Sequence, residues 1–319
     1  MTRRLFIACA LPPSVVSVFA GSFTVTYAGD GPPLSTEALL AGVAGHDALV
    51  VTAPTRVDRA LIERLPPGVE AVATYSVGHD HLDLAAAKEK GLAVFSTPDV
   101  LTDACAEAAL LLMLGAARRA TEAIALLRDQ RWTGWTPTQL NGWEITGKRL
   151  GIVGMGRLGR AIAARARAFR MPIHYHNRSR LPADLEGDAT YQPSLEALMA
   201  VSQVLVLACP GGEATRGLLH KERIARLPPG AIVVNIGRGS VVVDADLADA
   251  LDSGHLAAAG LDVFDGEPTL YPRYYTLPTL FMLPHIGSAT LETRNAMGQI
   301  LVEGLEAFWA GGAPVNRLV

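Results

Sequence analysis

Residues 150–160 read Leu150-Gly151-Ile152-Val153-Gly154-Met155-Gly156-Arg157-Leu158-Gly159-Arg160. A short apolar run ends in the glycine spacing GxGxxG, and an Ala- and Arg-rich stretch of helical composition follows it. A strand, a glycine turn and a helix in this order are typical of a dinucleotide site, where the N–H groups and the dipole of the helix start face the phosphates. An ordinary glycine turn is the alternative. We predict a cofactor site that includes Gly154, Gly156, Arg157, Leu158 and Gly159.

Each glycine has a separate physical role in such a unit. Gly154 permits the tight turn, and Gly159 lets the helix pack closely on the strand. Gly156 lets a pyrophosphate approach the backbone because it has no Cβ. The motif begins near the middle of the 319-residue chain, so a folded segment is expected to precede it. A chain of this length also favours two domains.

The composition excludes several classes of protein. Hydrophobic residues make up 50% of the chain, charged residues 18%, and the net charge is −3, so we expect a sizeable core and no nucleic-acid or membrane partner. Three scattered cysteines without metal-ligand spacing indicate a reducing compartment, no disulfide framework and no metal site. Pro12-Pro13 breaks the N-terminal apolar run, and the apolar stretch 108–117 is too short to span a bilayer, so we expect a soluble cytoplasmic protein.

Short apolar runs alternate with helical segments, which predicts an α/β fold with doubly wound parallel sheets. The first half has five predicted strands, Arg4–Ala8, Thr24–Ala28, Ala48–Val51, Ala71–Thr74 and Ala93–Phe95. Predicted helices between them are Ser35–Ala44, Val57–Leu65 and Leu82–Lys90. The second half has six predicted strands, Arg149–Val153, Pro172–His176, Val204–Ala208, Ala231–Ile236, Ala258–Val263 and Leu280–Leu283.

Two longer helices connect these halves. One is predicted from Thr102 to about Leu127, and the other from Thr290 to Trp309. The second follows the last strand and is expected to pack back on the first domain. We therefore predict a Rossmann dinucleotide domain, residues 98–287, inserted in a flavodoxin-like substrate domain, residues 1–97 plus 288–319. The cleft between two such domains is the default ligand site.

Three predicted strand ends of the second domain carry unusual chemistry, since Arg238, Glu267 and His285 each follow a strand. Ligands of a doubly wound sheet bind beyond these carboxyl ends. A guanidinium binds a carboxylate bidentately, and a histidine that titrates near neutrality can supply the proton for ketone reduction. A carboxylate behind the imidazole would orient it. Together they predict hydride reduction of a 2-oxo acid; singly, a solvated arginine, a turn-capping glutamate and a core histidine remain alternatives.

The order of motifs resembles that of the D-2-hydroxyacid dehydrogenases, in the glyoxylate/hydroxypyruvate reductase branch. The resemblance extends over nearly the whole chain. Besides the glycine motif, it rests on Ser76-Val77-Gly78-His79-Asp80-His81-Leu82-Asp83, Thr97-Pro98-Asp99-Val100-Leu101-Thr102-Asp103, Asn235-Ile236-Gly237-Arg238-Gly239, Gly260-Leu261-Asp262-Val263-Phe264 with Glu267-Pro268, and Leu283-Pro284-His285-Ile286-Gly287-Ser288.

The resemblance implies particular roles for the residues of these motifs. Arg238 would grip the substrate carboxylate, His285 would pass the proton and Glu267 would support the imidazole. The substrate site would comprise Val77 and Gly78, through their backbone N–H groups, with Trp135, Arg238, His285 and Ser288. The cofactor groove would be lined by Thr102, Cys209, Pro210, Thr215, Ile236 and Gly287, and Asp262 would hold the nicotinamide carboxamide. The remaining histidines near these motifs or on strands, His79, His81, His174 and His176, are interpreted as structural or rim residues.

One departure from the family pattern concerns the cofactor. Many NAD-using members carry Asp at the end of the second strand, about 20 residues after the first glycine, where it bonds the adenosine ribose. This chain has Asn177-Arg178-Ser179-Arg180 there. Asn177 removes the repulsion toward a 2′-phosphate, and Arg178, Ser179 and Arg180 can bind it. We predict a preference for NADPH over NADH; a solvated basic turn is the alternative.

Aromatic residues also distinguish the segment before the dinucleotide domain. It contains Trp132, Trp135 and Trp143, and it is similar to the dimer-forming arm of the family. A surface loop rich in Trp is unusual for a monomer. We predict a homodimer, with plain packing on the long helix as the alternative.

Other functions on the same fold stay open at this point. A phosphoglycerate-type dehydrogenase or a broad 2-ketoacid reductase fits the motifs, whereas formate-type relatives carry Gln in place of Glu267. A non-catalytic dinucleotide-sensing protein would have a vestigial site, but Arg238, Glu267 and His285 are all present. The substrate is expected to be a small 2-oxo acid, and the sequence does not rank glyoxylate, hydroxypyruvate and pyruvate.

Overall fold

The computed structural model describes residues 2–319, which form two compact units. Unit 1 joins the residues up to Leu101 to Ser288–Val319, and unit 2 comprises Thr102–Gly287. The division falls at Leu101, slightly beyond the predicted residue 97. The chain thus leaves unit 1 once and returns to it for its last segment. No helix within residues 2–319 is long and apolar enough to cross a membrane.

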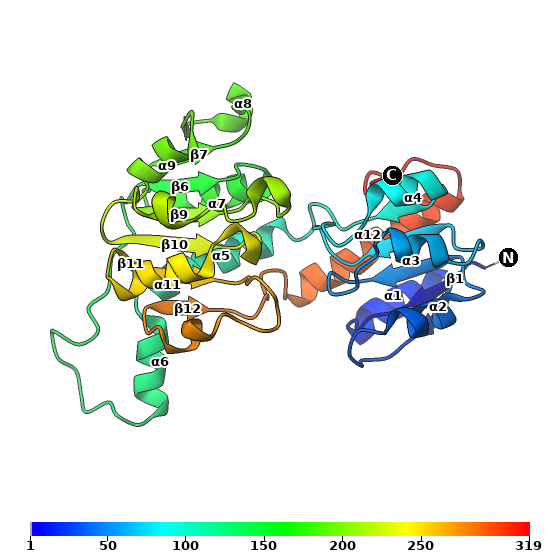
Figure 1. Cartoon of the computed structure of the whole chain (residues 1–319), viewed down its shortest axis with the longest axis horizontal. Coiled ribbons are helices and arrows are strands. Elements are labelled where there is room, and N and C mark those ends of the chain that lie inside the picture. The colour runs from blue at the N-terminus through cyan, green and yellow to red at the C-terminus, as the bar shows by residue number, and fades with distance from the viewer. Residues whose placement is uncertain (1) are drawn as a thin grey trace. The chain divides into compact units, whose positions relative to one another are not determined.

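Unit 1 is built on a parallel sheet of five strands (Figure 1). The strand order β2-β1-β3-β4-β5 is the flavodoxin-like order, so the predicted fold class of this domain is confirmed. The inner strands are almost entirely buried, as in parallel sheets covered on both faces, whereas the edge strand β2 is partly exposed. The strands are β1 (Arg4–Ile7), β2 (Thr24–Tyr27), β3 (Ala48–Val51), β4 (Ala71–Thr74) and β5 (Ala93–Phe95).

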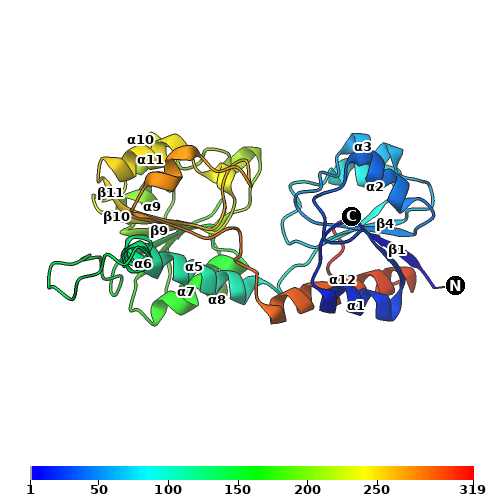
Figure 2. The same ribbon diagram turned by 90° about the horizontal axis from the view of Figure 1, so that it is seen from below.

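Helices cover both faces of this sheet (Figure 2). One face carries α1 (Pro13–Ser22) and α12 (Leu291–Trp309), and the other carries α2 (Thr36–Val43), α3 (Arg59–Arg64) and α4 (Leu84–Lys90). The sequence analysis missed α1, whose first residue is a proline; proline is well tolerated there because the first N–H groups of a helix have no intrahelical acceptor. The last helix, α12, packs on α1 and so belongs to unit 1.

Unit 2 contains a parallel sheet of seven strands in the order β12-β11-β10-β9-β6-β7-β8. Counted from β6, this is the Rossmann order with one additional edge strand, and the chain reverses its winding between β6 and β9. The prediction of six strands was wrong by one, because β8 is a two-residue edge strand without an apolar run. The strands are β6 (Leu150–Val153), β7 (Ile173–His176), β8 (Thr190–Tyr191), β9 (Val204–Leu207), β10 (Ala231–Asn235), β11 (Leu256–Leu261) and β12 (Leu280–Met282).

The helices of unit 2 also form two layers (Figure 2). One face carries α5 (Thr102–Ala117) and α7 (Arg157–Arg167), and the other carries α9 (Leu195–Val201), α10 (Lys221–Ile224) and α11 (Asp244–Asp252). The remaining elements are α6 (Ala120–Arg128), α8 (Ala183–Glu186) and the short 3-10 turns η1 (Glu213–Thr215), η2 (Gly239–Val241) and η3 (Pro272–Thr276).

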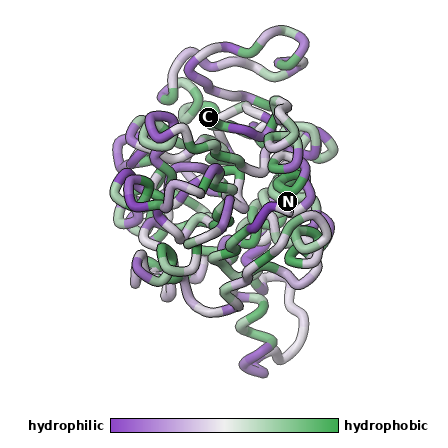
Figure 3. The backbone as a smooth tube through the Cα atoms, turned by 90° about the vertical axis from the view of Figure 1, so that its right-hand side faces the viewer, coloured by the Kyte–Doolittle hydropathy of each residue, from purple (hydrophilic) through white to green (hydrophobic). Residues whose placement is uncertain are grey.

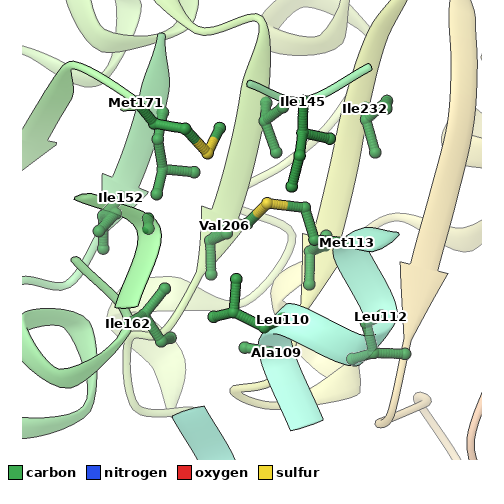
Figure 4. Close-up of a cluster of buried hydrophobic side chains, with 14 of the residues drawn as sticks. Ala109, Leu110, Leu112, Met113, Ile145, Ile152, Ile162, Met171, Val206 and Ile232 are labelled. Atoms are coloured by element: carbon green, nitrogen blue, oxygen red, sulfur yellow. The ribbon is translucent and has the colours of Figure 1, made fainter. Parts of the chain in front are cut away.

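Helix α5 lies at the centre of one of the two hydrophobic cores of unit 2. Leu110 and Met113 lie among side chains of the sheet and of α7, including Val206 and Ile162 (Figure 4). The helix approaches β11 closely, since a Cβ at Gly260 would lie only 2.7 Å from the Leu112 carbonyl oxygen. This tight packing supports the strand ends that carry the candidate site.

The predicted single helix from Thr102 to Leu127 is in fact two helices. The backbone carbonyl of Ala117 accepts the N–H of Trp143 at 2.8 Å instead of continuing the helix. Arg119 then adopts a left-handed conformation with φ 55°, and α6 starts in a new direction. The returning chain can approach so closely because residue 142 is a glycine, whose Cβ would lie 2.3 Å from that carbonyl oxygen.

Helix α6 and the loop 129–142 extend away from the sheet of unit 2 (Figures 1 and 2). None of the α6 residues is buried. Figure 3 shows this helix at the lower end of the view as mostly hydrophobic, with a hydrophilic end. We call α6 and residues 129–142 the arm.

Candidate active site

The glycine turn lies at the carboxyl end of β6, next to the reversal of winding. Gly154 has φ 95°, and a Cβ there would lie 2.8 Å from the Cys209 backbone nitrogen. A Cβ at Gly159 would lie 2.3 Å from the Gly154 carbonyl oxygen, so α7 can start this close to the strand only with glycine. Both positions therefore require the residue that the sequence provides.

Gly156 differs from these two glycines, because a Cβ there would meet no atom within 4 Å. It is the N-cap of α7, and no side chain caps the helix start. The start of α7, with the positive end of its helix dipole, therefore has no capping side chain, and the space beside Gly156 is open. This arrangement fits a pyrophosphate, and the residues from Gly154 to Gly159 would hold it.

The three predicted chemical groups follow neighbouring strands. Arg238 follows β10, Glu267 lies beyond β11, and His285 follows β12, and these strands are adjacent in the sheet. A Cβ at Gly239 would lie within 1.8 Å of the Phe264 backbone, so the turns after β10 and β11 are in direct contact. The parallel sheet brings together residues that are up to 47 positions apart, from 238 to 285.

The turn that carries Arg238 is held by a side chain to which the sequence analysis gave no role. Asn235 is fully buried at the end of β10. Its Oδ1 accepts the N–H of Gly237 at 3.1 Å, and its Nδ2 donates to the Arg238 carbonyl at 2.9 Å. The sequence signal that could have identified Asn235 is a polar residue at the end of an otherwise apolar strand.

Asp262 organises the turn after β12. Its carboxylate is 2% exposed and accepts the N–H groups of Ile286 and Gly287, each at 2.8 Å. Burial raises the pKa of Asp262, although these two N–H groups act in the opposite direction. A Cβ at Gly287 would lie 2.9 Å from Asp262 Oδ2, so this carboxylate also requires glycine beside it.

His285 stands in a strained position that its surroundings stabilise. Its φ is 54°, which is unusual for a residue with a side chain. Its N–H donates to the Asp262 carbonyl at 2.9 Å, and the next N–H donates to the carboxylate of the same residue. The backbone therefore fixes the direction in which the imidazole leaves the chain.

The imidazole of His285 is paired with Glu267. The distance from Nδ1 to Glu267 Oε2 is 2.7 Å, and Glu267 Oε1 accepts the Phe264 N–H at 2.8 Å. Burial alone would raise the pKa of Glu267, but its bonds with His285 and the Phe264 N–H, together with the charge of Arg238, lower it. An ionised carboxylate only accepts hydrogen bonds, so Nδ1 carries hydrogen and Nε2 remains the atom for proton exchange.

Arg238 is half-buried beside this pair. Its Nη1 donates to the Gly237 carbonyl at 2.8 Å. Its aliphatic stem packs against Gly211, where a Cβ would lie 2.9 Å from Arg238 Cγ. Since its charge lowers the pKa of Glu267, the guanidinium, the carboxylate and the imidazole form one electrostatic group.

The residues predicted to line the cofactor groove also lie along this edge of unit 2. Thr102 starts α5, and the side chains of Ile236 and Cys105 pack around Gly287, 3.2 and 3.4 Å from its ideal Cβ. Thr215 Oγ1 donates to the Pro210 carbonyl at 2.8 Å and so closes the loop after β9. Burial raises the pKa of Cys209 to about 11, so its thiol is unreactive.

The turn after β7 carries the predicted phosphate-binding residues. Asn177 Oδ1 accepts the N–H of Met155 at 2.7 Å, which ties this turn to the glycine motif. Because the oxygen is occupied by that donor, the amide NH2 is the group that Asn177 can offer to a ligand. A donor suits a phosphate or a ribose oxygen.

The two arginines of this turn differ in their partners. Arg180 is paired with Glu186, to which its Nε and Nη2 donate at 2.8–3.1 Å. Hydrogen bonds from Arg180 and Tyr175 hold the pKa of Glu186 below its ordinary value. Arg178 is exposed and has no ion pair within residues 2–319. The sequence suggests two equivalent arginines, and the ion pair with Glu186 makes Arg180 different from Arg178.

The other residues predicted to bind substrate do not contact Arg238, Glu267 and His285 within unit 2. Val77, Gly78 and Ser288 belong to unit 1, and Trp135 lies in the arm with 79% of its surface exposed. Two of the other histidines have structural partners: His176 Nδ1 contacts the Gln192 carbonyl at 2.8 Å, and Gln192 also contacts His174. The strand histidines thus stabilise the β7–β8 edge.

Comparison with known proteins extends these observations. Residues 110–287 match the family model "D-isomer specific 2-hydroxyacid dehydrogenase, NAD binding domain". The chain is 38% identical over 311 residues to a glycerate dehydrogenase of Hyphomicrobium methylovorum, covering 97% of each chain. It is 38% identical over 327 residues to a glyoxylate reductase of Pyrococcus furiosus, covering 100% of this chain and 97% of the relative.

A solved structure gives the same assignment. It is an NADPH-dependent glyoxylate/hydroxypyruvate reductase of Sinorhizobium meliloti, in complex with NADP and malonate. The TM-score is 0.89 at 31% identity, over 100% of this chain and 97% of that one. The similarity therefore includes both units and is not confined to the dinucleotide-binding part. The chain belongs to the D-isomer specific 2-hydroxyacid dehydrogenase family and is an NAD(P)-dependent oxidoreductase.

Proposed function

We propose that the protein reduces small 2-oxo acids of the glyoxylate and hydroxypyruvate type to D-2-hydroxy acids, with NADPH as the preferred cofactor. The observation that carries the proposal is the His285–Glu267 pair beside Arg238. Reduction of a 2-oxo acid needs a guanidinium that binds the substrate carboxylate. It also needs a proton donor, and the His285 imidazole can serve because Glu267 binds Nδ1 and Nε2 is left for proton transfer. Relatives described as glyoxylate reductase and glycerate dehydrogenase support the same substrate class.

In this proposal Arg238, His285 and Glu267 each have one role. Arg238 binds the substrate carboxylate, and its fork also reaches the adjacent keto oxygen. The reduced nicotinamide, when bound, supplies the hydride. His285 donates a proton from Nε2 to the oxygen on which charge develops, and Glu267 stabilises the imidazolium and keeps its orientation. In unit 1, the N–H groups of Val77 and Gly78 are the donors proposed for the substrate carboxylate.

The cofactor would lie on the residues around the glycine turn. The first N–H groups of α7 bind the pyrophosphate, and Asp262 accepts from the nicotinamide carboxamide. Asp262 is well suited to this, because its carboxylate is already oriented by two backbone N–H groups. Asn177, Arg178 and Ser179 would bind a 2′-phosphate, with Arg180 beside them.

A panel of substrates tests the activity directly. Glyoxylate, hydroxypyruvate, pyruvate and phenylpyruvate are compared by kcat/KM with NADPH and NADH, using His285→Ala as the matched inactive control. We expect the small acids to be reduced faster than phenylpyruvate. If NADPH binds but no 2-oxo acid is reduced, the protein is a dinucleotide sensor on this fold and the proposal is wrong.

We further propose that the arm forms a homodimer. Its apolar side chains are unusually exposed: Ile124 is 45%, Leu127 60%, Trp132 53% and Trp135 79% exposed. Side chains of this size gain about 1.5–3 kcal/mol each when they are buried. Light scattering at micromolar concentration should give twice the mass of one chain, and Leu127→Glu with Trp132→Ala should lower it. A fully active monomer contradicts this proposal.

A further inference from the structure

We propose that His81, Thr74 and Ser76 form a directed hydrogen-bond chain that positions the loop 76–79 for substrate binding. The inference rests on the proposed function, in which the N–H groups of Val77 and Gly78 bind the substrate carboxylate. It gives His81 a positioning role instead of the purely structural or rim role that the sequence suggested.

Three short contacts make up the chain. Thr74 is the last residue of β4 and is fully buried. Its Oγ1 lies 2.9 Å from His81 Nε2 and 2.8 Å from Ser76 Oγ. Ser76 Oγ in turn lies 2.7 Å from the carbonyl oxygen of Gly78. The end of β4, the loop and the residues before α4 are thereby joined.

The chemistry of the groups determines the direction of every bond. A carbonyl oxygen only accepts, so Ser76 must donate its single hydroxyl hydrogen to Gly78. Ser76 then accepts from Thr74, which uses the single hydroxyl hydrogen of Thr74. Thr74 must therefore accept from His81, and the ring nitrogen Nε2 of His81 carries hydrogen. All donors point along the chain toward the loop.

The same bonds direct the free N–H groups of the loop. The Ser76 carbonyl accepts the N–H of Thr97 at 3.0 Å, and in a trans peptide the following N–H, that of Val77, points the opposite way. The Gly78 carbonyl is held by Ser76, so the N–H of His79 likewise points away. Within residues 2–319 neither Val77 nor Gly78 has an acceptor for its N–H, and Val77 is 42% exposed. The N–H of Val77 is therefore directed away from Thr97 and, like that of Gly78, remains available as a donor.

Loss of the Thr74 hydroxyl would break this hydrogen-bond chain and free the loop 76–79 to change its conformation. The Nε2–H of His81 and the acceptor of Ser76 would each lose their partner, and Ser76 could rotate away from Gly78. Donors that are held in one orientation before binding lose less entropy when they bind an anion. The loop should therefore bind substrate more weakly without any change in the chemical step.

Kinetics of matched variants test the positioning role. Thr74→Val removes the hydroxyl with little change in shape, and Thr74→Ser keeps it. We expect Thr74→Val to raise the KM for glyoxylate about three- to tenfold, the equivalent of one net hydrogen bond, with kcat and the KM for NADPH unchanged. Thr74→Ser should stay close to the unmodified protein.

Thr26→Val is the control for loss of a part-buried Thr–His hydrogen bond in the same sheet. Thr26 Oγ1 lies 2.8 Å from His46 Nε2, on the edge strand β2. Its removal should leave the KM for glyoxylate unchanged. The inference is wrong if Thr74→Val has the KM of the unmodified protein, or if Thr26→Val raises it equally.

A second measurement does not depend on turnover. Nitrogen-15 spectra of labelled histidines report the tautomer of neutral His81, and we expect hydrogen on Nε2; hydrogen on Nδ1 overturns the chain. If Arg238→Lys raises the KM but Thr74→Val does not, this inference fails while the proposed function holds. If Arg238→Lys leaves the KM unchanged, the proposed function fails and the substrate role of the loop fails with it, whatever the tautomer.

Discussion

In two regions at the carboxyl edge of the sheet in unit 2, a glutamate binds a nitrogen-bearing side chain, but the two pairs serve different purposes. In the region after β11 and β12, Glu267 holds the imidazole of His285. In the turn after β7, Glu186 holds the guanidinium of Arg180. The first pair is supported by backbone bonds to Asp262 and Phe264. In the second pair, the buried Glu186 is held by the hydroxyl of Tyr175, whereas Arg180 is exposed.

The difference indicates what each region has to do. A proton donor must stand in one orientation, so its strained backbone and its carboxylate are both fixed from behind. A phosphate that is bound by charge needs less exact geometry, and side chains at the surface suffice. We therefore expect substitutions in the first region to act on kcat and those in the second to act on cofactor choice.

The largest effect is expected from loss of the His285 imidazole. His285→Ala removes the proton donor and should lower kcat about 10²–10⁴-fold, while NADPH still binds. Fluorescence titration of NADPH with the variant serves as the control for an intact cofactor site. Near-normal kcat at neutral pH would contradict the assignment of His285.

The next effect concerns the guanidinium beside it. Arg238→Lys keeps the charge but loses the bidentate fork, so KM should rise and kcat should fall, lowering kcat/KM about 10- to 150-fold. Steady-state kinetics with glyoxylate measure both parameters. If Lys works as well as Arg, the carboxylate is held elsewhere.

For the exposed turn we expect an effect on cofactor selection that is of similar size at low salt and smaller at high salt. One charge-assisted hydrogen bond corresponds to about 1.5–3 kcal/mol, which predicts about 10- to 150-fold preference for NADPH and less at high salt. Because Glu186 already engages Arg180, Arg178→Ala should reduce the preference more than Arg180→Ala does. NADH kinetics should stay nearly unchanged in both variants.

Two results would contradict this reading of the turn. Equal kcat/KM values for NADPH and NADH at low salt in the unmodified protein would return Arg178 and Arg180 to the class of solvated surface residues. A larger loss in Arg180→Ala than in Arg178→Ala would show that the pairing with Glu186 orients Arg180 for the phosphate instead of occupying it.

The smallest expected effect is on stability and depends on pH. The pKa of Glu267 is lower in the folded protein than its ordinary value of 4.5, so its ionised form stabilises the fold above that pH and this contribution is lost as the pH falls through the folded pKa. Denaturant unfolding of the unmodified protein and Glu267→Gln should show a stability difference that narrows on acidification. A difference independent of pH would mean that Glu267 is not ionised in the fold.

Much of the fold follows from local patterns in the chain. Gly154 and Gly159 are predictable because a tight turn and a close approach of helix and strand leave no room for a Cβ, and Gly156 follows from the same motif spacing. The alternation of apolar runs with helical segments predicts both parallel sheets, because strands buried on two faces must be apolar throughout. The strand ends with Arg238 and His285 follow from the same pattern, since parallel strands place their carboxyl ends at one edge.

Other features depend on partners that become neighbours only after folding. Helix α5 ends because Trp143 takes the Ala117 carbonyl, and no local signal in 117–120 predicts that. Glu186 distinguishes Arg180 from Arg178, and Asn177 is tied to Met155 across the turn of another strand. The sequence by itself determined which groups stand at the edge of the sheet, because periodicity and glycine sterics are local properties. The tertiary structure decided which atoms of those groups remain available, because a hydrogen bond depends on the position and direction of both partners.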